Sequence, residues 1–320
     1  MRLHYAIGLT VCMMVIGCVG LNTTLPQITL DQIEAEQIWQ EQQAFKEMDR
    51  LRARLDTVAF RVLAANQDLC EKTTLDVGVQ TLTLDAFPKE LKKAAQRELG
   101  LGDEPMIVFV RPGSDAEAAG LKPGDQLFNT VGDPLGVPGK AFKKAMERNE
   151  DIILQRGSQR ETIKLSGQRV CDYPVRLKMS AEINAYANGR SITMMAGMMN
   201  FVISDEELAY IIGHELAHNT EDHVRKSIFN YVISFGGTRF TRPFEAEADY
   251  VGLYFMERAG YDSSNIEDFW RRLALQSVRP IGRAKTHPTF PDRFVRLRAA
   301  RAEIRDKQSK NEKLVPEPNP

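Results

Sequence analysis

Residues 204–218 read SDEELAYIIGHELAH, and the fold of the surrounding chain follows from this stretch. Ser204 followed three positions later by Glu207 forms a capping box, which is typical of the first turn of an α-helix. Apolar residues then recur at helical spacing from Leu208 to Leu216, as they do on the core-facing side of a helix. The pattern therefore predicts one core-packed helix, and this prediction is independent of the histidines on it.

Two histidines, His214 and His218, stand four positions apart in this stretch. Side chains at this spacing project from the same face of a helix, so both imidazoles can reach a single cation. Glu215 lies beside them and can take a proton from a water that a zinc ion has made acidic. The pattern predicts a zinc site with Glu215 as the general base of peptide hydrolysis. A pair of purely structural histidines is the alternative.

A second motif, EAEAD at residues 245–249, supplies acidic groups downstream. A catalytic zinc takes three protein ligands and leaves one position open. Glu245 and Asp249 share a helix face, so we expect Glu245 to be the third ligand and Asp249 to accept the other ring N–H of a ligating histidine. Glu247 lies about 200° around the helix from Glu245, so we exclude it from this group. An exposed carboxylate stabilised by the helix dipole is the alternative for Glu245.

The order HExxH then ExxxD resembles the gluzincin metallopeptidase family that includes HtpX, BepA and the CAAX prenyl endopeptidases. The resemblance covers about residues 173–300 and implies a mainly helical zincin-type domain with a small edge sheet. It also implies that the segments at 184–187 and 191–195 form the edge strand that aligns an extended substrate. The expected substrate-aligning residues of the second segment are Ser191, Ile192, Thr193 and Met194.

A later segment, Thr286-His287-Pro288 with Arg293, resembles another motif of the same family. The resemblance implies that His287 approaches the zinc as a removable fourth ligand that keeps the enzyme latent. Once displaced, His287 would help to stabilise the oxyanion. Arg293 is expected to support the ligands from behind. A structural histidine in a turn is the alternative for His287.

Residues 106–128 read MIVFVRPGSDAEAAGLKPGDQLF, which predicts a strand, a turn, a short helix, a second turn and a strand. Ser114 is the expected cap of the short helix and Gly120 its end. The string resembles a PDZ domain of the bacterial HtrA type over about residues 75–166. Such domains bind an extended peptide, often a carboxyl terminus, at a sheet edge. The candidate peptide-binding loop consists of Leu99, Gly100, Leu101 and Gly102. The alternative is an insert that only packs against or shields its neighbour.

The amino terminus resembles a bacterial lipoprotein signal, because Arg2 precedes an apolar run at 5–16 and residues 15–18 read VIGC. Cleavage before Cys18 would make that cysteine the acylated first residue of the mature chain. Since Val19 is not acidic, the resemblance implies no retention at an inner membrane. We therefore expect a lipid anchor on the periplasmic face of a Gram-negative outer membrane. An uncleaved membrane anchor and a plain signal peptide are the alternatives.

The other two cysteines, Cys70 and Cys171, flank the PDZ-like segment. An exported chain enters an oxidising compartment in which two cysteines can form a disulfide, and we favour that pairing. It would join the two ends of the insert. Zinc ligation is one alternative, although these cysteines lack the close spacing of a thiolate site. Two buried thiols are the other.

The composition narrows the class of protein. The 320 residues carry a formal net charge of −1, and no basic stripe interleaved with aromatic residues is present, so nucleic-acid binding is excluded.

The expected fold class is α+β. The expected parts are a signal peptide at 1–18, a helical segment at 19–72, the PDZ-like domain at 73–167, the metalloprotease domain at 168–304 and a disordered tail at 305–320. Within the second part, apolar residues three and four apart predict one long helix, or two, between 30 and 65.

These observations together predict a zinc-dependent endopeptidase of the bacterial cell envelope that binds one zinc ion per chain. Its expected partners are extended or misfolded protein substrates, the membrane through Cys18 and a carboxyl-terminal peptide at the PDZ-like domain. The alternative is a non-proteolytic envelope chaperone or peptide-binding lipoprotein that acts through the PDZ-like domain.

Overall fold

The computed structural model describes residues 25–226, 242–276 and 290–317. The expectations for Cys18 and His287 therefore lie outside the described residues. The chain separates into two units, residues 1–40 and residues 41–320, and the site described below belongs to the second. No helix within the described ranges combines the length and the apolar character that crossing a bilayer requires.

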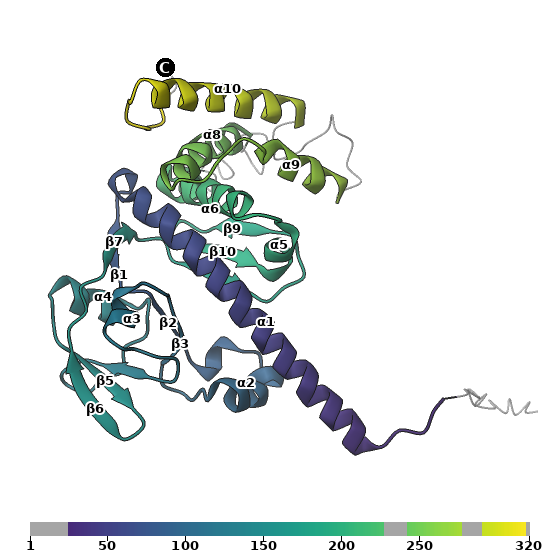
Figure 1. Cartoon of the computed structure of the whole chain (residues 1–320), viewed down its shortest axis with the longest axis vertical. Helices are drawn as coiled ribbons and strands as arrows, with labels where there is room; N and C mark the ends of the chain where they lie inside the picture. The colour runs from purple at the N-terminus through teal and green to yellow at the C-terminus, as the bar shows by residue number, and fades with distance from the viewer. Residues whose placement is uncertain (1–24, 227–241, 277–289, 318–320) are drawn as a thin grey trace, which may run out of the picture. The chain divides into compact units, whose positions relative to one another are not determined.

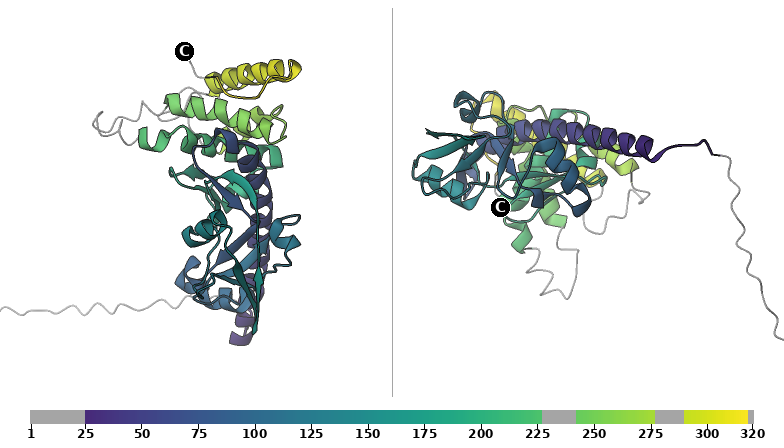
Figure 2. Two further views of the ribbon diagram at one scale, coloured as in Figure 1. Left: turned by 90° about the vertical axis from the view of Figure 1, so that its left-hand side faces the viewer. Right: turned by 90° about the horizontal axis from the view of Figure 1, so that it is seen from below.

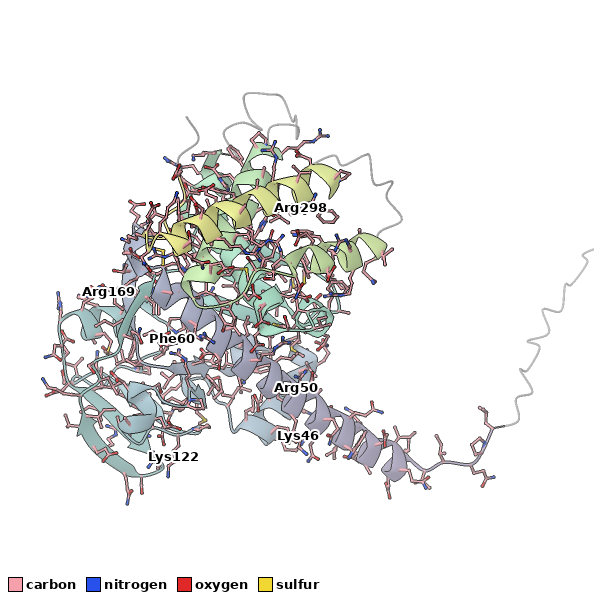
Figure 3. The ribbon with its side chains drawn as sticks, turned by 45° about the horizontal axis from the view of Figure 1, so that its top comes forward. Lys46, Arg50, Phe60, Lys122, Arg169 and Arg298 are labelled. Atoms are coloured by element: carbon pink, nitrogen blue, oxygen red, sulfur yellow. A yellow bond between two sulfur atoms is a disulfide. The ribbon has the colours of Figure 1, made fainter. Side chains whose placement is uncertain are left out.

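A single long helix, α1, runs from Leu30 to Ala65, which confirms the one-helix reading of this amphipathic segment (Figure 1). Its apolar residues three and four apart are buried from Phe45 onward, and they include Leu51, Leu55, Val58 and Val62. Burial of one face explains the helix, because charged residues such as Lys46 and Arg50 occupy the other side and point outward (Figure 3).

The carboxyl-terminal half of α1 packs into the main hydrophobic core together with a small sheet and a group of helices. The sheet contains β8 (Val175–Lys178), β9 (Ala185–Ala187) and β10 (Ile192–Met195). The helices are α5 (Ala196–Phe201), α6 (Asp205–Thr220), α8 (Arg242–Arg258), α9 (Ile266–Leu275) and α10 (Phe290–Ser309). Helix α8 lies between α6 and α10, so α6 is covered on one side by the sheet and on the other by helices (Figures 1 and 2).

The strand order corrects one expectation. The order is β8-β10-β9, with β10 parallel to β8 and antiparallel to β9. The strand that contains Ile192, Thr193 and Met194, preceded by Ser191, is therefore central and not an edge. The central position agrees with its burial, because the side chains of Ile192 and Met194 are fully buried. The neighbouring strand β9 forms an edge of this sheet.

The contact between α6 and α8 depends on two glycines. A Cβ added to Gly213 would lie 2.7 Å from the carbonyl oxygen of Gly252, and one added to Gly252 would lie 2.8 Å from the amide nitrogen of His214. These distances are shorter than a Cβ can tolerate, so only glycine lets the two backbones approach this closely. No local pattern in the sequence predicts this pair.

The inserted segment has a hydrophobic core of its own. Antiparallel strands β1 (Thr73–Asp76) and β7 (Gln168–Cys171) pair at its base. Between them lie two further sheets, β2-β3 and β4-β5-β6. Their bounds are β2 (Val79–Leu82), β3 (Met106–Val110), β4 (Gln126–Phe128), β5 (Ile152–Arg156) and β6 (Gln159–Ile163). The helices are α2 (Lys92–Leu99), α3 (Asp115–Ala118) and α4 (Lys140–Glu147), and the 3-10 turns are η1 (Gln67–Leu69), η2 (Leu84–Ala86) and η3 (Lys89–Leu91).

Residues 106–128, whose pattern resembles part of a PDZ domain, form the expected strand, turn, short helix, turn and strand. Ser114 Oγ accepts a hydrogen bond from the Glu117 amide at the start of α3, and Gly113 and Gly120 adopt positive φ angles of 74° and 78°. The strand after the second turn ends at Phe128, because Asn129 then accepts backbone hydrogen bonds in a turn.

Arg111 attaches this segment to α1. Its guanidinium donates to Asp56 of α1 at 2.6 Å and to Asp76 at 2.8 Å, and it stacks 3.8 Å from the centre of the Phe60 ring. The side chains of Arg111 and Asp56 are each less than a tenth exposed. Loss of Arg111 would leave the buried Asp56 carboxylate without its counterion, which costs about 3–5 kcal/mol.

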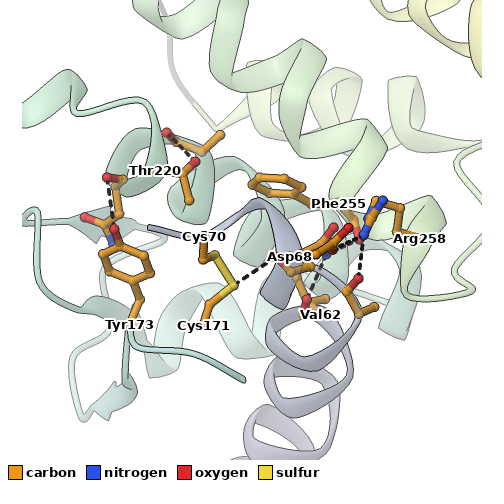
Figure 4. Close-up of a disulfide and its surroundings, with 12 residues drawn as sticks. Val62, Asp68, Cys70, Cys171, Tyr173, Thr220, Phe255 and Arg258 are labelled. Atoms are coloured by element: carbon orange, nitrogen blue, oxygen red, sulfur yellow. Dashed lines mark hydrogen bonds and ion pairs between the residues drawn. A yellow bond between two sulfur atoms is a disulfide. The ribbon is translucent and has the colours of Figure 1, made fainter. Parts of the chain in front are cut away.

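The base of the insert is closed by a disulfide between Cys70 and Cys171, with Cα atoms 5.6 Å apart (Figure 4). The nearby Asn66 side chain is fully buried and donates to the carbonyl oxygens of Val62 on α1 and Phe255 on α8, at 2.8 and 2.9 Å. The end of α1 is thereby fixed to the helix that carries Glu245.

The carboxyl-terminal segment corrects a second expectation, since residues 305–317 are not disordered. Helix α10 continues to Ser309, and the chain then folds back along it. Lys307 is buried and its ammonium donates to the carbonyl oxygen of Val315 at 2.9 Å. Arg258 of α8 donates to the Leu314 carbonyl at 2.9 Å. The composition of the tail is polar, but these specific contacts supply the order that composition alone does not predict.

Candidate active site

Three groups from two helices converge on one point. His214 and His218 lie on α6, and Glu245 lies in the first turn of α8. The Nε2 atoms of the two histidines are 3.1 Å apart, and each lies 3.6 Å from one oxygen of Glu245. These are the three residues that the sequence assigned as ligands, and their ligand atoms all lie within 4.8 Å of one another. Within the described residues, they make up the only group of this kind.

The spacing of these atoms fits a zinc ion. Zinc binds imidazole nitrogen and carboxylate oxygen at about 2.0–2.2 Å in tetrahedral sites, so two of its ligand atoms lie about 3.3–3.6 Å apart. The two Nε2 atoms, 3.1 Å apart, come close to this range, and each lies 3.6 Å from a different oxygen of Glu245. Two neutral nitrogens and one carboxylate are also the donor set of a catalytic zinc, in which the fourth position stays open.

Glu215 follows His214 directly on α6 and is 8% exposed. Ser204 Oγ accepts from the Glu207 amide at the start of this helix, as the capping box predicted, whereas the Glu207 carboxylate accepts from the amide of Ile203, one residue before the cap. Glu207 also pairs with Arg272 of α9 at 2.6 Å. The helix that carries Glu215 is therefore fixed at its first turn.

Asp249 supports His214 from the side opposite the metal position. One of its oxygens lies 3.1 Å from His214 Nδ1 and accepts from the Tyr210 hydroxyl at 2.8 Å. The other accepts from Arg293 Nε at 2.6 Å. Trp270 completes the group, since its indole N–H donates to Tyr210 and its ring lies 3.6 Å from the Arg293 guanidinium carbon. Sequence reasoning predicted Asp249 and Arg293 but not Tyr210 or Trp270.

The pKa values of this cluster show how it holds charge. Burial alone would raise the pKa of Asp249, but the Arg293 guanidinium and the contacts from His214 and Tyr210 keep it below its usual value. Burial also opposes a charge on His214, yet the carboxylates of Asp249 and Glu245 outweigh burial and raise its pKa to about 10. Burial and the neighbouring His214 lower the pKa of His218 to about 3. At neutral pH, and without metal, the His214 imidazole is therefore positively charged and the His218 imidazole is neutral.

A further histidine lies behind His218. His223 Nδ1 is 3.1 Å from His218 Nδ1, and His223 Nε2 is 3.0 Å from Glu247 Oε2. The imidazole of His223 is 1% exposed and stacks on the Phe244 ring, with centroids 4.8 Å apart. Burial lowers the pKa of His223, and Glu247 only partly offsets this effect. Glu247 is not one of the three converging residues, but it contacts His218 through His223. In the sequence, only the position of His223, five residues after His218, pointed to this contact.

The edge strand β9 lies beside the helix that carries the ligands. Asn219, next to His218, makes this connection. Its amide donates to the Ser191 carbonyl at 3.3 Å and its side-chain oxygen accepts from the Gly189 amide at 2.6 Å. The turn between β9 and β10 is thus fixed to α6 directly beside a ligand.

The loop from Leu99 to Gly102 follows helix α2, where Gly100 ends the helix in the left-handed conformation. Leu101 is 1% exposed and belongs to a small cluster with Phe45 and Met48 of α1. The loop therefore contributes to the packing between the insert and α1, and peptide binding by it stays a prediction. His287 and Cys18 lie outside the described residues, so their roles stay predictions as well.

Comparison with known proteins supports the chemistry of this geometry. The family profile "Peptidase family M48" matches residues 161–238 and 227–301. The chain is similar to a "Mitochondrial metalloendopeptidase OMA1" of Arabidopsis thaliana, with 29% identity over 121 residues, which are 31% of this chain and 25% of the relative. It is also similar to a "Beta-barrel assembly-enhancing protease" of Yersinia pestis, with 22% identity over 231 residues, 55% of this chain and 47% of the relative. The protein of the same name from Escherichia coli shows 25% identity over 155 residues, 37% of this chain and 32% of the relative.

The matched region contains both helices of the site. His214 and His218 fall within the first matched range and Glu245 within the second. The chain spans less than half the length of each of these curated relatives. The comparisons therefore support the metallopeptidase domain, and they leave the insert between β1 and β7 largely outside the family profile.

Proposed function

We propose that the protein is a zinc-dependent endopeptidase whose catalytic domain is similar to peptidase family M48, the family whose profile matches residues 161–238 and 227–301. The single observation that carries the proposal is the convergence of His214, His218 and Glu245 from two helices, beside Glu215. A zinc ion held there would polarise a peptide carbonyl and make a water acidic enough to be deprotonated near neutral pH.

The protein residues divide the remaining work. Glu215 takes the proton from the attacking water and passes it to the nitrogen of the leaving amine. Asp249 holds the His214 ring in the orientation that presents Nε2 to the metal position, and Arg293 keeps Asp249 charged and in place. His287 follows the described residues of α9 and is assigned here, by resemblance, to latency or to stabilisation of the oxyanion.

We assign substrate alignment to β9 in place of β10. Strand β9 has a single partner, β10, in its sheet, and it lies against α6. An extended peptide that pairs with a sheet edge through backbone hydrogen bonds is read with little sequence preference. Tyr186 of β9 is 40% exposed and would contact such a peptide. The expected substrates are thus unfolded or misassembled proteins that offer an extended segment.

We place the enzyme in the cell envelope, with a lipid anchor at Cys18. The sequence before Cys18 has the composition of a signal peptide, and the disulfide between Cys70 and Cys171 is of the kind that persists in oxidising compartments. The periplasmic face of a Gram-negative outer membrane satisfies both observations. The name of the bacterial relatives, which refers to β-barrel assembly, is in keeping with this location.

The insert is proposed to be a PDZ-like domain that recruits protein partners. The expected order of strands, turns and capped helix supports this assignment. The edge of β2 is engaged by the chain itself, since the Thr81 amide donates to the Val137 carbonyl at 3.0 Å and Thr81 Oγ1 accepts from the Val137 amide at 2.8 Å. A peptide that adds to β2 would have to displace this pairing.

Cleavage of casein by the purified full-length chain and by Glu215→Gln tests the proposal. We expect wild type to bind one zinc ion and cleave casein, and Glu215→Gln to bind zinc as tightly and lose at least a hundredfold in cleavage, because only the general base is removed. Equal cleavage by both proteins, or none by either with zinc bound, would instead favour a non-proteolytic binding protein that acts through the insert.

A further inference from the structure

His223 touches a metal-binding histidine and has no place in the mechanism above. Between its Nδ1 and the Nδ1 of His218, 3.1 Å apart, lies room for one hydrogen only. In a neutral imidazole one nitrogen donates and the other accepts, so the roles of both rings are coupled. Which nitrogen holds the hydrogen follows from what the remaining nitrogens face.

The partners of the two Nε2 atoms determine which ring donates the hydrogen bond between His218 and His223. His218 Nε2 faces His214 Nε2 and Glu245, where the metal binds, so that nitrogen must be free of hydrogen when it ligates. The hydrogen of His218 is then on Nδ1 and is donated to His223 Nδ1. The hydrogen of His223 is consequently on Nε2, from which it is donated to Glu247 Oε2 at 3.0 Å. The chain of donors therefore ends on a carboxylate, which accepts only.

The surroundings hold this arrangement in place. The His223 ring is 1% exposed, and its near-parallel stacking on Phe244, with 18° between the planes, fixes its plane. Glu247 is half-exposed, so its carboxylate is accessible to water as well as to His223. His214 receives the equivalent support from Asp249 on the other side of the site. Each ligating histidine thus has its own acceptor behind it.

We infer that His223 and Glu247 are positioning residues that fix the tautomer and ring orientation of His218 for metal binding. This inference rests on the proposed zinc site and deepens it. Partners behind a ligand raise its basicity and hold its geometry, and their loss typically weakens metal affinity by about 10–100-fold. Neither residue touches the substrate or the metal, so their effect passes through His218.

The test is the zinc dissociation constant of the full-length protein, measured by competition with a chromophoric chelator. His223→Leu removes the acceptor and keeps an apolar filling, and we expect zinc to bind about 10–100-fold more weakly. His223→Gln keeps a side-chain carbonyl that can accept from His218, and we expect it to recover most of that loss. Glu247→Ala should fall between wild type and His223→Leu. Glu206→Gln, in the first turn of α6, is the matched control and should equal wild type.

Two readouts independent of activity separate a positioning role from a structural one. The melting temperature of each metal-free variant reports folding, and we expect His223→Leu to unfold cooperatively at a moderately lower temperature, because His218 Nδ1 loses its hydrogen-bond partner. In zinc-loaded wild type, a proton NMR signal from the hydrogen-bonded Nδ1–H of His218 should appear downfield and vanish in His223→Leu. Zinc binding by His223→Leu as tight as in wild type, or no rescue by His223→Gln in a folded protein, would overturn the inference alone. Wild type that takes up no zinc would overturn the proposed function itself.

Discussion

At the scale of single residues, Asp249 is the side chain on which the geometry of the site most depends. It accepts from Tyr210 and Arg293 and contacts His214, and all of this lies in the buried interior. We predict that Asp249→Asn weakens zinc binding about 10–100-fold, because an amide cannot serve all three partners. It should also lower the melting temperature, since Arg293 is 3% exposed and loses its counterion. Chelator competition and thermal unfolding measure both effects.

The control for this prediction is Asp268→Asn. Asp268 pairs with Arg271 on the exposed face of α9, and such pairs contribute little to stability. A variant of Asp249 that behaves like this control in both measurements would show that Asp249 has no role behind His214.

Protonation of His214 gives a prediction about pH. Its pKa of about 10 in the metal-free protein means that zinc must displace a proton at neutral pH. Zinc affinity should therefore rise roughly tenfold per pH unit up to the neighbourhood of pH 10. Because the folded pKa lies above the ordinary value of 6.5, this proton stabilises the metal-free fold fully below that value, and the stabilisation is lost as the pH rises through 10. Calorimetry in buffers of different ionisation enthalpy should report about one proton released per zinc.

Some residues of the site can be assigned to it from the sequence alone, and others cannot. The spacings of His214, His218, Glu245 and Asp249 follow helix geometry, so local periodicity is enough to group them. His223 and Glu247 come from different elements, and their contact depends on how the segment after α6 meets α8. That arrangement is tertiary and leaves no periodic signal in the sequence.

At the scale of elements, the contact between α6 and α8 sets the distance from the histidines to Glu245. We predict that Gly252→Ala lowers stability by about 1–3 kcal/mol, because its Cβ would meet the His214 backbone at 2.8 Å. Zinc affinity should fall in the same variant, since the helices must separate. Urea unfolding and chelator competition measure the two effects.

Gly102→Ala provides the control for the helix contact. A Cβ at Gly102 meets no atom within 4 Å, so this variant should match wild type in both measurements. Unchanged zinc affinity in Gly252→Ala would mean that the close approach of the two backbones is not what places Glu245.

The sequence largely predicted which segments are helices and strands, but it did not predict which of them lie beside one another. The capping box and the apolar period predicted α6, and the long amphipathic period predicted α1 with its observed bounds. The position of β10 in the centre of its sheet was missed because it depends on parallel pairing with β8, which the residue pattern of β10 itself does not reveal. The order of residues 305–317 was missed because the contacts of Lys307 and Leu314 are tertiary.

At the scale of the whole molecule, the disulfide connects the insert to the metallopeptidase core. Cys70 and Cys171 are 101 residues apart in the sequence, and closing a loop of this length stabilises a protein by up to about 4.7 kcal/mol. We predict that dithiothreitol lowers the melting temperature of wild type. The double variant Cys70→Ser and Cys171→Ser should melt at the temperature of the reduced protein and be insensitive to dithiothreitol. A wild type unaffected by reduction would contradict this role.

The separate hydrophobic core of the insert agrees with its own sequence texture, and its flanking cysteines marked the point where its ends meet. The way in which the insert attaches to α1 through Arg111 and Asp56 was not, since a buried ion pair between distant residues has no local pattern. Local spacing groups the residues of the metal site, whereas no local pattern groups the contacts of the insert, so the sequence predicted more of the metal site than of the insert.

The central claim is that one zinc ion binds between two histidines of α6 and a glutamate of α8. An anomalous difference map from a crystal of the zinc-loaded protein, collected at the zinc absorption edge, tests it most directly. The account predicts one peak about 2.0–2.2 Å from Nε2 of His214, Nε2 of His218 and a carboxylate oxygen of Glu245. A peak elsewhere in the chain, or one that Glu245 does not reach, would contradict it.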